Sequence, residues 1–251
     1  MLALTTTSTS TSTSTSTSTS TSTSTSTSTS TSTSTSTSTT TAPGILWTCP
    51  STNPASRIGT GNDAPQGSFP FYVTNGDLAG AIIHPNYILT HVSFGNSRVG
   101  YGLTEQESYA DVLNESYPYI TNIVETVVLG NNEMRLSRVD PPFEFSPTVQ
   151  PLKFSDCSGP SNPALGTTLG IFGLGFTNTG SLAETMQYKC VETIADTDFC
   201  ENNEVTYSQS LCISAGPCFR DWGGPVVVEG GGELYLVGII GSADIFCSEL
   251  R

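Results

Sequence analysis

The stretch Cys218–Val228, CFRDWGGPVVV, is typical of a reactive loop that leads into a buried strand. Its Gly-Gly-Pro turn precedes three valines, and a tight turn of this kind exposes the residue before it. Nucleophilic chemistry at that position requires a small hydroxyl or thiol that a neighbouring base activates. Trp222 occupies the position instead, and an indole offers only an N–H donor. The loop therefore has the backbone pattern for nucleophilic catalysis but lacks the nucleophile.

The cysteine and histidine content restricts the metal and redox chemistry of the chain. The seven cysteines are widely spaced without a CxxC pair, and there are only two histidines. We therefore expect no metal site and no cofactor. Wide cysteine spacing predicts disulfides and an oxidising compartment, so we expect a secreted protein. The start of the chain is too short and uncharged for a signal peptide, and Asn114 begins a common type of glycosylation triplet.

The chain has two parts of different composition. Residues 5–41 are thirty-seven consecutive Thr and Ser, so we expect residues 1–43 to be disordered. Such a tract is an O-glycosylated stalk, a simple-sequence expansion or a gene-model error. The remainder is long enough for one sizeable domain or two small ones. Its 22 acidic and eight basic residues give a net charge of −14, which argues against nucleic acid as a partner, and no apolar run is long enough to cross a membrane.

Short apolar segments recur between turn residues in this second part. They are rich in β-branched and aromatic residues and show no sustained helical period. This pattern predicts an all-β sandwich or barrel protein. Glu229–Glu233 is expected to form a hairpin turn, and Pro141–Pro163 a linker between two β halves. The segments are Phe69–Val73, Ala81–Ile83, Tyr87–Leu89, Ile120–Leu129, Thr168–Phe172, Val226–Val228 and Leu234–Ile240.

Several motifs, in their order and spacing, resemble the chymotrypsin-like or trypsin-like serine proteases. The resemblance runs from Cys49 to the end of the chain and implies a fold of two six-stranded antiparallel β-barrels. The motifs are an activation site at Ser56–Gly61 with Gly67–Pro70, the strand before the catalytic histidine at Tyr87–Thr90, the nucleophile loop at Asp221–Pro225 and the strand lining the substrate cleft at Val237–Ile240.

The resemblance also implies domain boundaries. Residues 44–57 correspond to a pro-segment that a disulfide tethers, and residues 58–251 to the protease-like domain. The first barrel is expected at 58–145 and the second at 160–251. Proteases of this family continue beyond the position of Cys247 with a strand and a helix, so we expect the second barrel to lack its closing strand.

The three positions that carry catalysis in this family hold other residues here. The nucleophile position is Trp222, and the base position is Ser93, whose hydroxyl is not a base near neutral pH. The carboxylate position is Glu133, which has no imidazole to orient. His91 becomes the base only if two residues are deleted directly after an anchored strand. We therefore expect no catalytic residue in this chain.

Two further positions depart from the family pattern. Arg220 stands where the family has the glycine whose N–H stabilises the oxyanion. Gly216 is at the base of the specificity pocket, so no charge is present there to select Lys or Arg. Substrate binding is therefore expected to be impaired together with the chemistry.

The resemblance implies three disulfides and leaves one cysteine over. Each disulfide typically contributes about 2–4 kcal/mol to stability. The remaining cysteine, Cys190, is either a buried thiol or an intermolecular link. The implied pairs are Cys49 with Cys157, Cys200 with Cys212, and Cys218 with Cys247.

Arg57–Ile58 is a candidate cleavage site for a trypsin-like protease. In the family the new amino terminus pairs with the buried aspartate, here Asp221, and this pair orders the loops around it. One hypothesis is a cleavage-driven conformational switch without catalysis. The alternative is that Asp221 accepts local backbone N–H groups in an uncut chain.

These substitutions favour a non-catalytic, secreted protease homologue. We expect it to bind a protein partner as a cofactor or decoy in a proteolytic cascade, and the sequence defines neither that partner nor the oligomeric state. One alternative is an active serine-type endopeptidase, as the family label implies. Another is a degenerate or mispredicted gene product.

Overall fold

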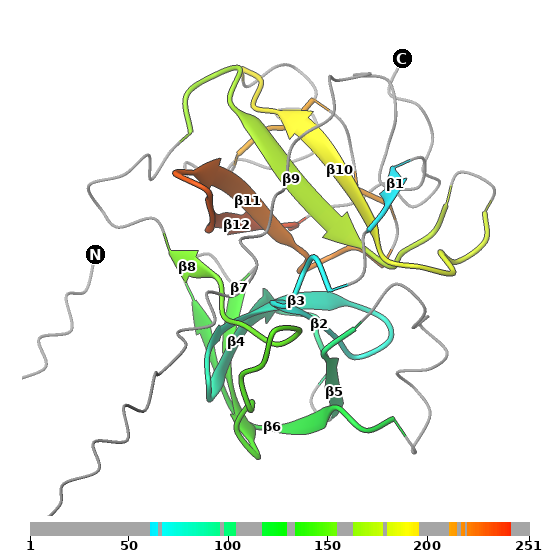
Figure 1. The fold of residues 1–251 in the computed structure, drawn as a ribbon, viewed down its shortest axis with the longest axis vertical. Helices are drawn as coiled ribbons and strands as arrows, with labels where there is room; N and C mark the ends of the chain where they lie inside the picture. Colours follow the sequence, from blue (N-terminus) through cyan, green and yellow to red (C-terminus); the bar gives the residue numbers. More distant parts are fainter. Residues whose placement is uncertain are drawn as a thin grey trace, which may run out of the picture. The chain divides into compact units, whose positions relative to one another are not determined.

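The described part of the chain folds into β-strands and loops. In the computed structural model the described residues are 61–64, 67–95, 98–103, 117–129, 134–154, 163–177, 180–195, 211–214, 217–218 and 220–241. All of them belong to one unit, residues 41–251. They contain twelve strands and no helix, which confirms the predicted all-β fold class (Figure 1). Within these ranges no helix is long and apolar enough to span a membrane.

Six strands close into a barrel with the order β2-β3-β4-β7-β6-β5. Neighbouring strands are antiparallel, and successive side chains point to opposite faces. On β7, for example, Arg135, Ser137 and Val139 are buried and alternate with half-buried residues. The strands are β2 (Tyr72–Thr74), β3 (Ala79–His84), β4 (Tyr87–His91), β5 (Arg98–Tyr101), β6 (Ile120–Leu129) and β7 (Met134–Asp140).

The other six strands form a second sheet with the order β1-β10-β9-β11-β12-β8. β8 runs parallel to β12, and the remaining pairs are antiparallel. β1 falls in the stretch assigned to the first barrel from sequence, but it pairs with β10 of this sheet. The strands are β1 (Asn62–Asp63), β8 (Lys153–Phe154), β9 (Thr168–Gly173), β10 (Gln187–Glu192), β11 (Pro225–Gly230) and β12 (Glu233–Ile239).

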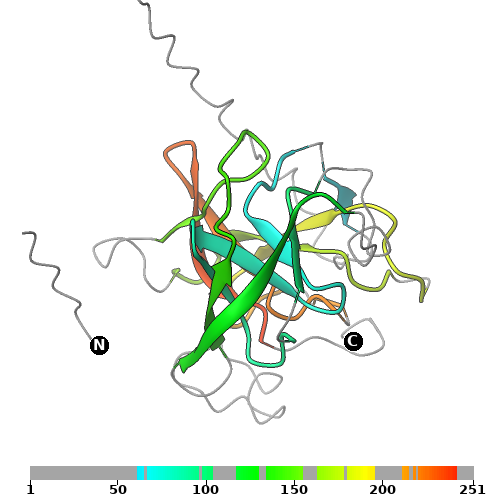
Figure 2. The same ribbon diagram turned by 90° about the horizontal axis from the view of Figure 1, so that it is seen from below.

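The hairpin between β11 and β12 has the turn that the sequence predicts. Gly230 pairs with Glu233, and the two glycines between them have positive φ angles, 65° for Gly231 and 82° for Gly232. Glycine adopts this left-handed conformation without a steric penalty, which explains the Gly-rich turn. β11 contacts β3 and β12 contacts β4, so the hairpin lies beside the barrel in both views (Figure 1, Figure 2).

The barrel and the second sheet share a hydrophobic core, which we call the shared core. It contains Phe71 and Leu89 from the barrel side and Phe172 and Val227 from the sheet. The Phe172 ring lies 4.1 Å from the Phe69 ring and 5.7 Å from the Phe71 ring, measured between centroids. Burial of these rings supplies much of the stabilising free energy between the two parts.

Two smaller cores lie inside the two parts. Trp222 contacts both of them from the loop before β11. The barrel core contains Val73, Leu78, Ile82, Ile88, Phe94, Val99, Tyr101, Val139, Phe143 and Val149. The sheet core contains Leu169, Ile171, Val191, Val226 and Ile240.

Within the stretch expected to be a linker, residues 141–152 pack against the barrel, and Lys153–Phe154 form β8 of the second sheet. Phe143, Val149 and Leu152 are buried. The Leu152 N–H donates to the Ile82 carbonyl at 2.9 Å. The sequence pattern missed this packing because proline and serine dominate the segment and its apolar residues have no regular period.

Replacement of Phe172 by Ala should lower the free energy of unfolding by about 3–5 kcal/mol, because the ring is fully buried in the shared core. Urea unfolding measures the loss. Phe154→Ala on β8 is the matched control, since that ring is 53 % exposed, and its expected cost is below about 1 kcal/mol. Equal losses in the two variants would contradict the position of the shared core.

Candidate functional site

Three loops meet where the second sheet approaches the barrel: the turn after β2, the loop after β4 and the loop before β11. The Ala79 N–H donates to the Trp222 carbonyl at 2.9 Å. Gly223 has a φ of 82°, and a Cβ added to it would clash with the Ala79 carbonyl oxygen and stand 2.9 Å from the His91 nitrogen. Glycine at this position therefore permits the close approach of the loop to the barrel.

Trp222 fills the space between the barrel core and the sheet core. Its half-buried indole packs against apolar residues of both. The indole and the His91 imidazole have centroids 6.0 Å apart and planes inclined by 38°. The structure thus brings these two rings together at the position where the sequence pattern predicts a nucleophile.

The backbone of the next turn fixes the orientation of the His91 ring. The Ser93 N–H donates to His91 Nδ1 at 3.1 Å, and the Ser93 side chain is exposed. Burial lowers the pKa of His91 below its ordinary value, which favours the neutral ring. Because Nδ1 accepts this hydrogen bond, the proton of the neutral ring resides on Nε2.

A buried guanidinium supports the loop that carries His91 and Ser93. Arg135 Nη1 donates to the Val92 carbonyl at 3.4 Å and Nη2 to the Gly95 carbonyl at 3.3 Å. Nε donates to the Ser137 hydroxyl at 3.2 Å. Burial lowers the pKa of Arg135, although a guanidinium stays protonated in proteins. The sequence motifs do not identify Arg135 as part of the site. The alternation of inward-facing and outward-facing residues along β7 is the signal that could identify it as buried.

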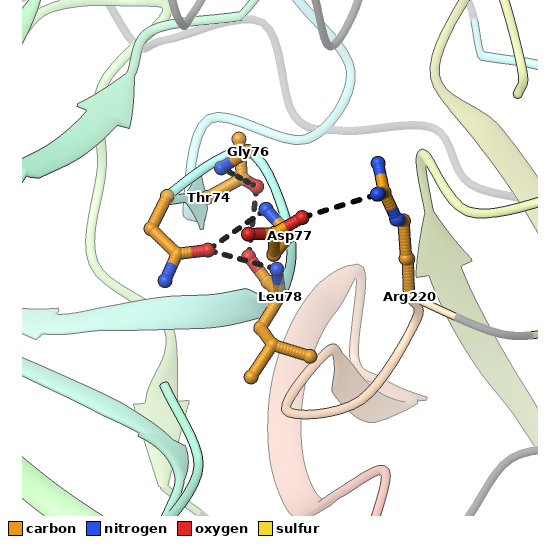
Figure 3. A network of polar contacts seen from close by, with 6 residues as sticks. Thr74, Gly76, Asp77, Leu78 and Arg220 are labelled. Atoms are coloured by element: carbon orange, nitrogen blue, oxygen red, sulfur yellow. Dashed lines mark hydrogen bonds and ion pairs between the residues drawn. The ribbon is translucent and has the colours of Figure 1, made fainter. Parts of the chain in front are cut away.

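Arg220 lies in an unusual backbone conformation for its residue type. Its φ is 75°, the left-handed region that favours glycine. Its Nη2 atom lies 3.3 Å from Asp77 Oδ1 (Figure 3). Its guanidinium lies 5.7 Å from the centre of the Phe176 ring. The side chain therefore connects the loop before β11 to the turn after β2.

The turn after β2 holds Asp77 in place for this ion pair. Asn75 Oδ1 accepts the N–H groups of Asp77 at 2.9 Å and Leu78 at 2.8 Å. The Thr74 hydroxyl accepts the Gly76 N–H at 3.0 Å and donates to the Leu78 carbonyl at 2.7 Å (Figure 3). These side-chain bonds to the backbone are the usual means by which Asn and Thr stabilise a turn.

The Asp221 carboxylate is fully buried and accepts two backbone N–H groups. Oδ1 bonds to the Gly175 N–H at 2.9 Å and Oδ2 to the Cys218 N–H at 2.8 Å. Burial raises the pKa of Asp221 to about 7, although both hydrogen bonds act to lower it. Gly173 lies against the carboxylate, where a Cβ would clash. In the uncut chain Asp221 thus accepts local N–H groups, as one of the two alternatives states, and the cleavage-driven switch stays a prediction.

A buried phenol lies close to the same carboxylate. Burial, followed by the nearby charge of Asp221, raises the pKa of Tyr72. Tyr72 belongs to β2 and Asp221 to the loop before β11, so this electrostatic interaction connects the barrel to the second sheet. The sequence contains no local signal for it.

Cys190, Cys212 and Cys218 are each disulfide-bonded. The expectation that Cys190 is left over is therefore wrong, because cysteine spacing does not define connectivity. The pairs of Cys212 with Cys200 and of Cys218 with Cys247 stay predictions.

Several predicted site residues lie outside the described ranges, and their roles stay predictions. Within those ranges, no group of three or more His, Cys, Asp and Glu side chains could hold a metal ion. The predicted residues outside are the carboxylate position Glu133, the pocket position Gly216, the cleavage pair Arg57 and Ile58, the glycosylation candidate Asn114, and Cys49, Cys157, Cys200 and Cys247.

A comparison with protein-family models relates this chain to a known family. The model described as Trypsin matches residues 58–250. These residues include the barrel, the second sheet and all three loops of the site.

Asp221 should make the stability of the uncut chain fall as the pH rises. Its pKa in the folded state, about 7, exceeds the ordinary value of 3.8, so the native state binds the proton more tightly between these values. The contribution of Asp221 to the free energy of unfolding is full below about pH 4. It is lost as the pH rises through about 7, and the loss is up to about 4 kcal/mol.

Urea unfolding at several pH values between about 4 and 8, compared with Asp221→Asn, isolates this effect from that of the other carboxylates. The advantage of the wild type over the variant should shrink as the pH rises. If the free energies of unfolding of the wild type and Asp221→Asn ran parallel across this pH range, the raised pKa of Asp221 would be contradicted.

Proposed function

Because the chain belongs to the trypsin family, we propose that it is a non-catalytic member that acts outside the cell as a protein-binding module. Extracellular action accords with the disulfide-bonded cysteines and with the family, whose domains are commonly secreted. A role as cofactor or decoy in a proteolytic cascade follows from this proposal. Trp222, His91 and Arg220 support the non-catalytic role, since each stands at or near a position that carries catalysis in the family.

The packing of Trp222 is the observation that carries the proposal. By resemblance to the family, Trp222 stands at the nucleophile position. Its indole contacts both the barrel core and the sheet core, and it has no oxygen or sulfur that could attack a carbonyl. The ring also fills volume that a substrate carbonyl requires.

The hydrogen bond at His91 argues against this residue as the base. In serine hydrolases the imidazole donates from Nδ1 to a carboxylate and presents an unprotonated Nε2 to the nucleophile. His91 Nδ1 instead accepts the Ser93 N–H at 3.1 Å. Burial lowers the pKa of His91 and so disfavours the imidazolium that a general base must form.

Arg220 supports the proposal from the side of the oxyanion position. Its guanidinium is engaged with Asp77 and lies near the Phe176 ring. The side chain thus crosses from the second sheet to the barrel at the position where the family has no side chain. A peptide substrate that approaches this position meets the ion pair.

The purified chain should not react with an active-site reagent. We expect no covalent labelling by a fluorophosphonate and no burst with a peptide ester, because both require an activated serine. Mass spectrometry and stopped-flow absorbance measure these outcomes, with an active trypsin-family protease as the positive control. Stoichiometric labelling would overturn the proposal in favour of an active endopeptidase.

Restoring a hydroxyl alone should not restore reactivity. We expect Trp222→Ser to remain unlabelled by the fluorophosphonate, because His91 Nδ1 accepts the Ser93 N–H and the proton resides on Nε2, the reverse of the arrangement in a serine hydrolase. Near-UV circular dichroism checks that the variant is folded. Labelling of Trp222→Ser that disappears when His91 is also replaced by Ala would instead identify His91 as a base.

A further inference from the structure

The Arg135 guanidinium lies inside the barrel without a carboxylate beside it. Arg135 is 7 % exposed, and it shares the inward face of β7 with Val139 of the barrel core. The ion pairs of the described residues involve other basic side chains. Because a buried charge without a counter-ion is costly, this guanidinium requires an anionic partner.

The hydrogen bonds of this guanidinium fix its position but leave some of its donors unused. Nε donates to the Ser137 hydroxyl at 3.2 Å, whereas Nη1 and Nη2 donate to the carbonyls of Val92 and Gly95 at 3.4 Å and 3.3 Å. The two carbonyl distances exceed the usual upper limit of about 3.2 Å, so these two bonds are weak. An arginine side chain has five N–H donors, and these contacts use three of them. Two N–H groups therefore remain for a ligand.

A buried hydroxyl lies directly across from Arg135 on the neighbouring strand. Thr90 of β4 is the register partner of Arg135, and the Cβ atoms of such a pair stand about 4.5–5.5 Å apart on the same face of the sheet. Thr90 is fully buried, and its Oγ1 atom has no hydrogen-bond partner among the described residues. Its methyl group lies against Gly80 of β3, on the side of β4 away from β7, so the methyl group does not separate the hydroxyl from Arg135.

We propose that Arg135 and Thr90 bind a chloride ion inside the barrel, beneath the loop after β4. Guanidinium N–H groups and a hydroxyl all donate hydrogen bonds, and chloride accepts them while it neutralises the buried charge. A water molecule accepts the same hydrogen bonds but leaves the charge uncompensated. A monatomic ion also suits a position between paired residues of adjacent strands, where a carboxylate or phosphate group needs more space. Chloride binding here does not depend on whether the chain is catalytic.

Thermal unfolding of the full chain in chloride and in gluconate, at a constant ionic strength of about 0.15 M, tests this site. Chloride should raise the Tm by at least about 2 °C over gluconate, because it binds the folded state alone and gluconate is too large to enter. Thr90→Val replaces the hydroxyl by a methyl group and should at least halve this shift. Arg135→Met removes the charge and should abolish the shift.

Arg138→Met is the matched control, since Arg138 lies on the same strand but is partly exposed and pairs with Glu125. It should keep the full chloride shift, which separates the site from a general effect of salt on an acidic protein. Broadening of the chlorine NMR signal by the wild type, and less by Thr90→Val, reports binding directly even if Arg135→Met fails to fold. The proposal is overturned if the wild type has the same Tm in chloride and gluconate, or if Arg138→Met loses the shift as Arg135→Met does.

Discussion

The close approach of the loop before β11 to the barrel is the constraint on which the site depends. The Trp222 carbonyl accepts the Ala79 N–H at 2.9 Å, and Gly223 leaves no room for a side chain in this contact. On the other side, the Asp221 carboxylate holds the backbone N–H groups of Gly175 and Cys218. Because the backbone of the loop is anchored from both sides, its exposed positions can accept different side chains without a change in its path.

The unusual side chains of the site each have a local structural partner. Arg220 adopts a left-handed φ of 75°, which costs a non-glycine residue about 1–2 kcal/mol. Its ion pair with Asp77 and its proximity to the Phe176 ring each offset this by at most about 1 kcal/mol. Trp222 is accommodated by packing against two cores and Arg135 by three hydrogen bonds. The site is therefore well packed in its own right, which accords with the proposed non-catalytic role.

The acidic surface and the packed loops of the site bear on how the proposed module engages a partner. Trp222 and the Arg220–Asp77 pair fill the region where the three loops of the site meet. Under the proposed non-catalytic role, recognition of a partner falls to other surfaces of the domain. The strong net negative charge acts over a longer range and favours basic partners at low salt.

Local features could be predicted from the sequence, and long-range ones could not. Strand β6 matches the predicted segment Ile120–Leu129, and the Gly-rich turn after β11 matches the predicted hairpin turn, because β-branched runs and turn chemistry depend on adjacent residues. The resemblance to a family likewise identified Trp222 as the residue in the nucleophile loop. Only the tertiary structure revealed the Arg135 bonds to Val92 and Gly95 and the bonded state of Cys190. These interactions join segments that are far apart in the chain, and a local pattern carries no information about which distant segment folding will place beside it.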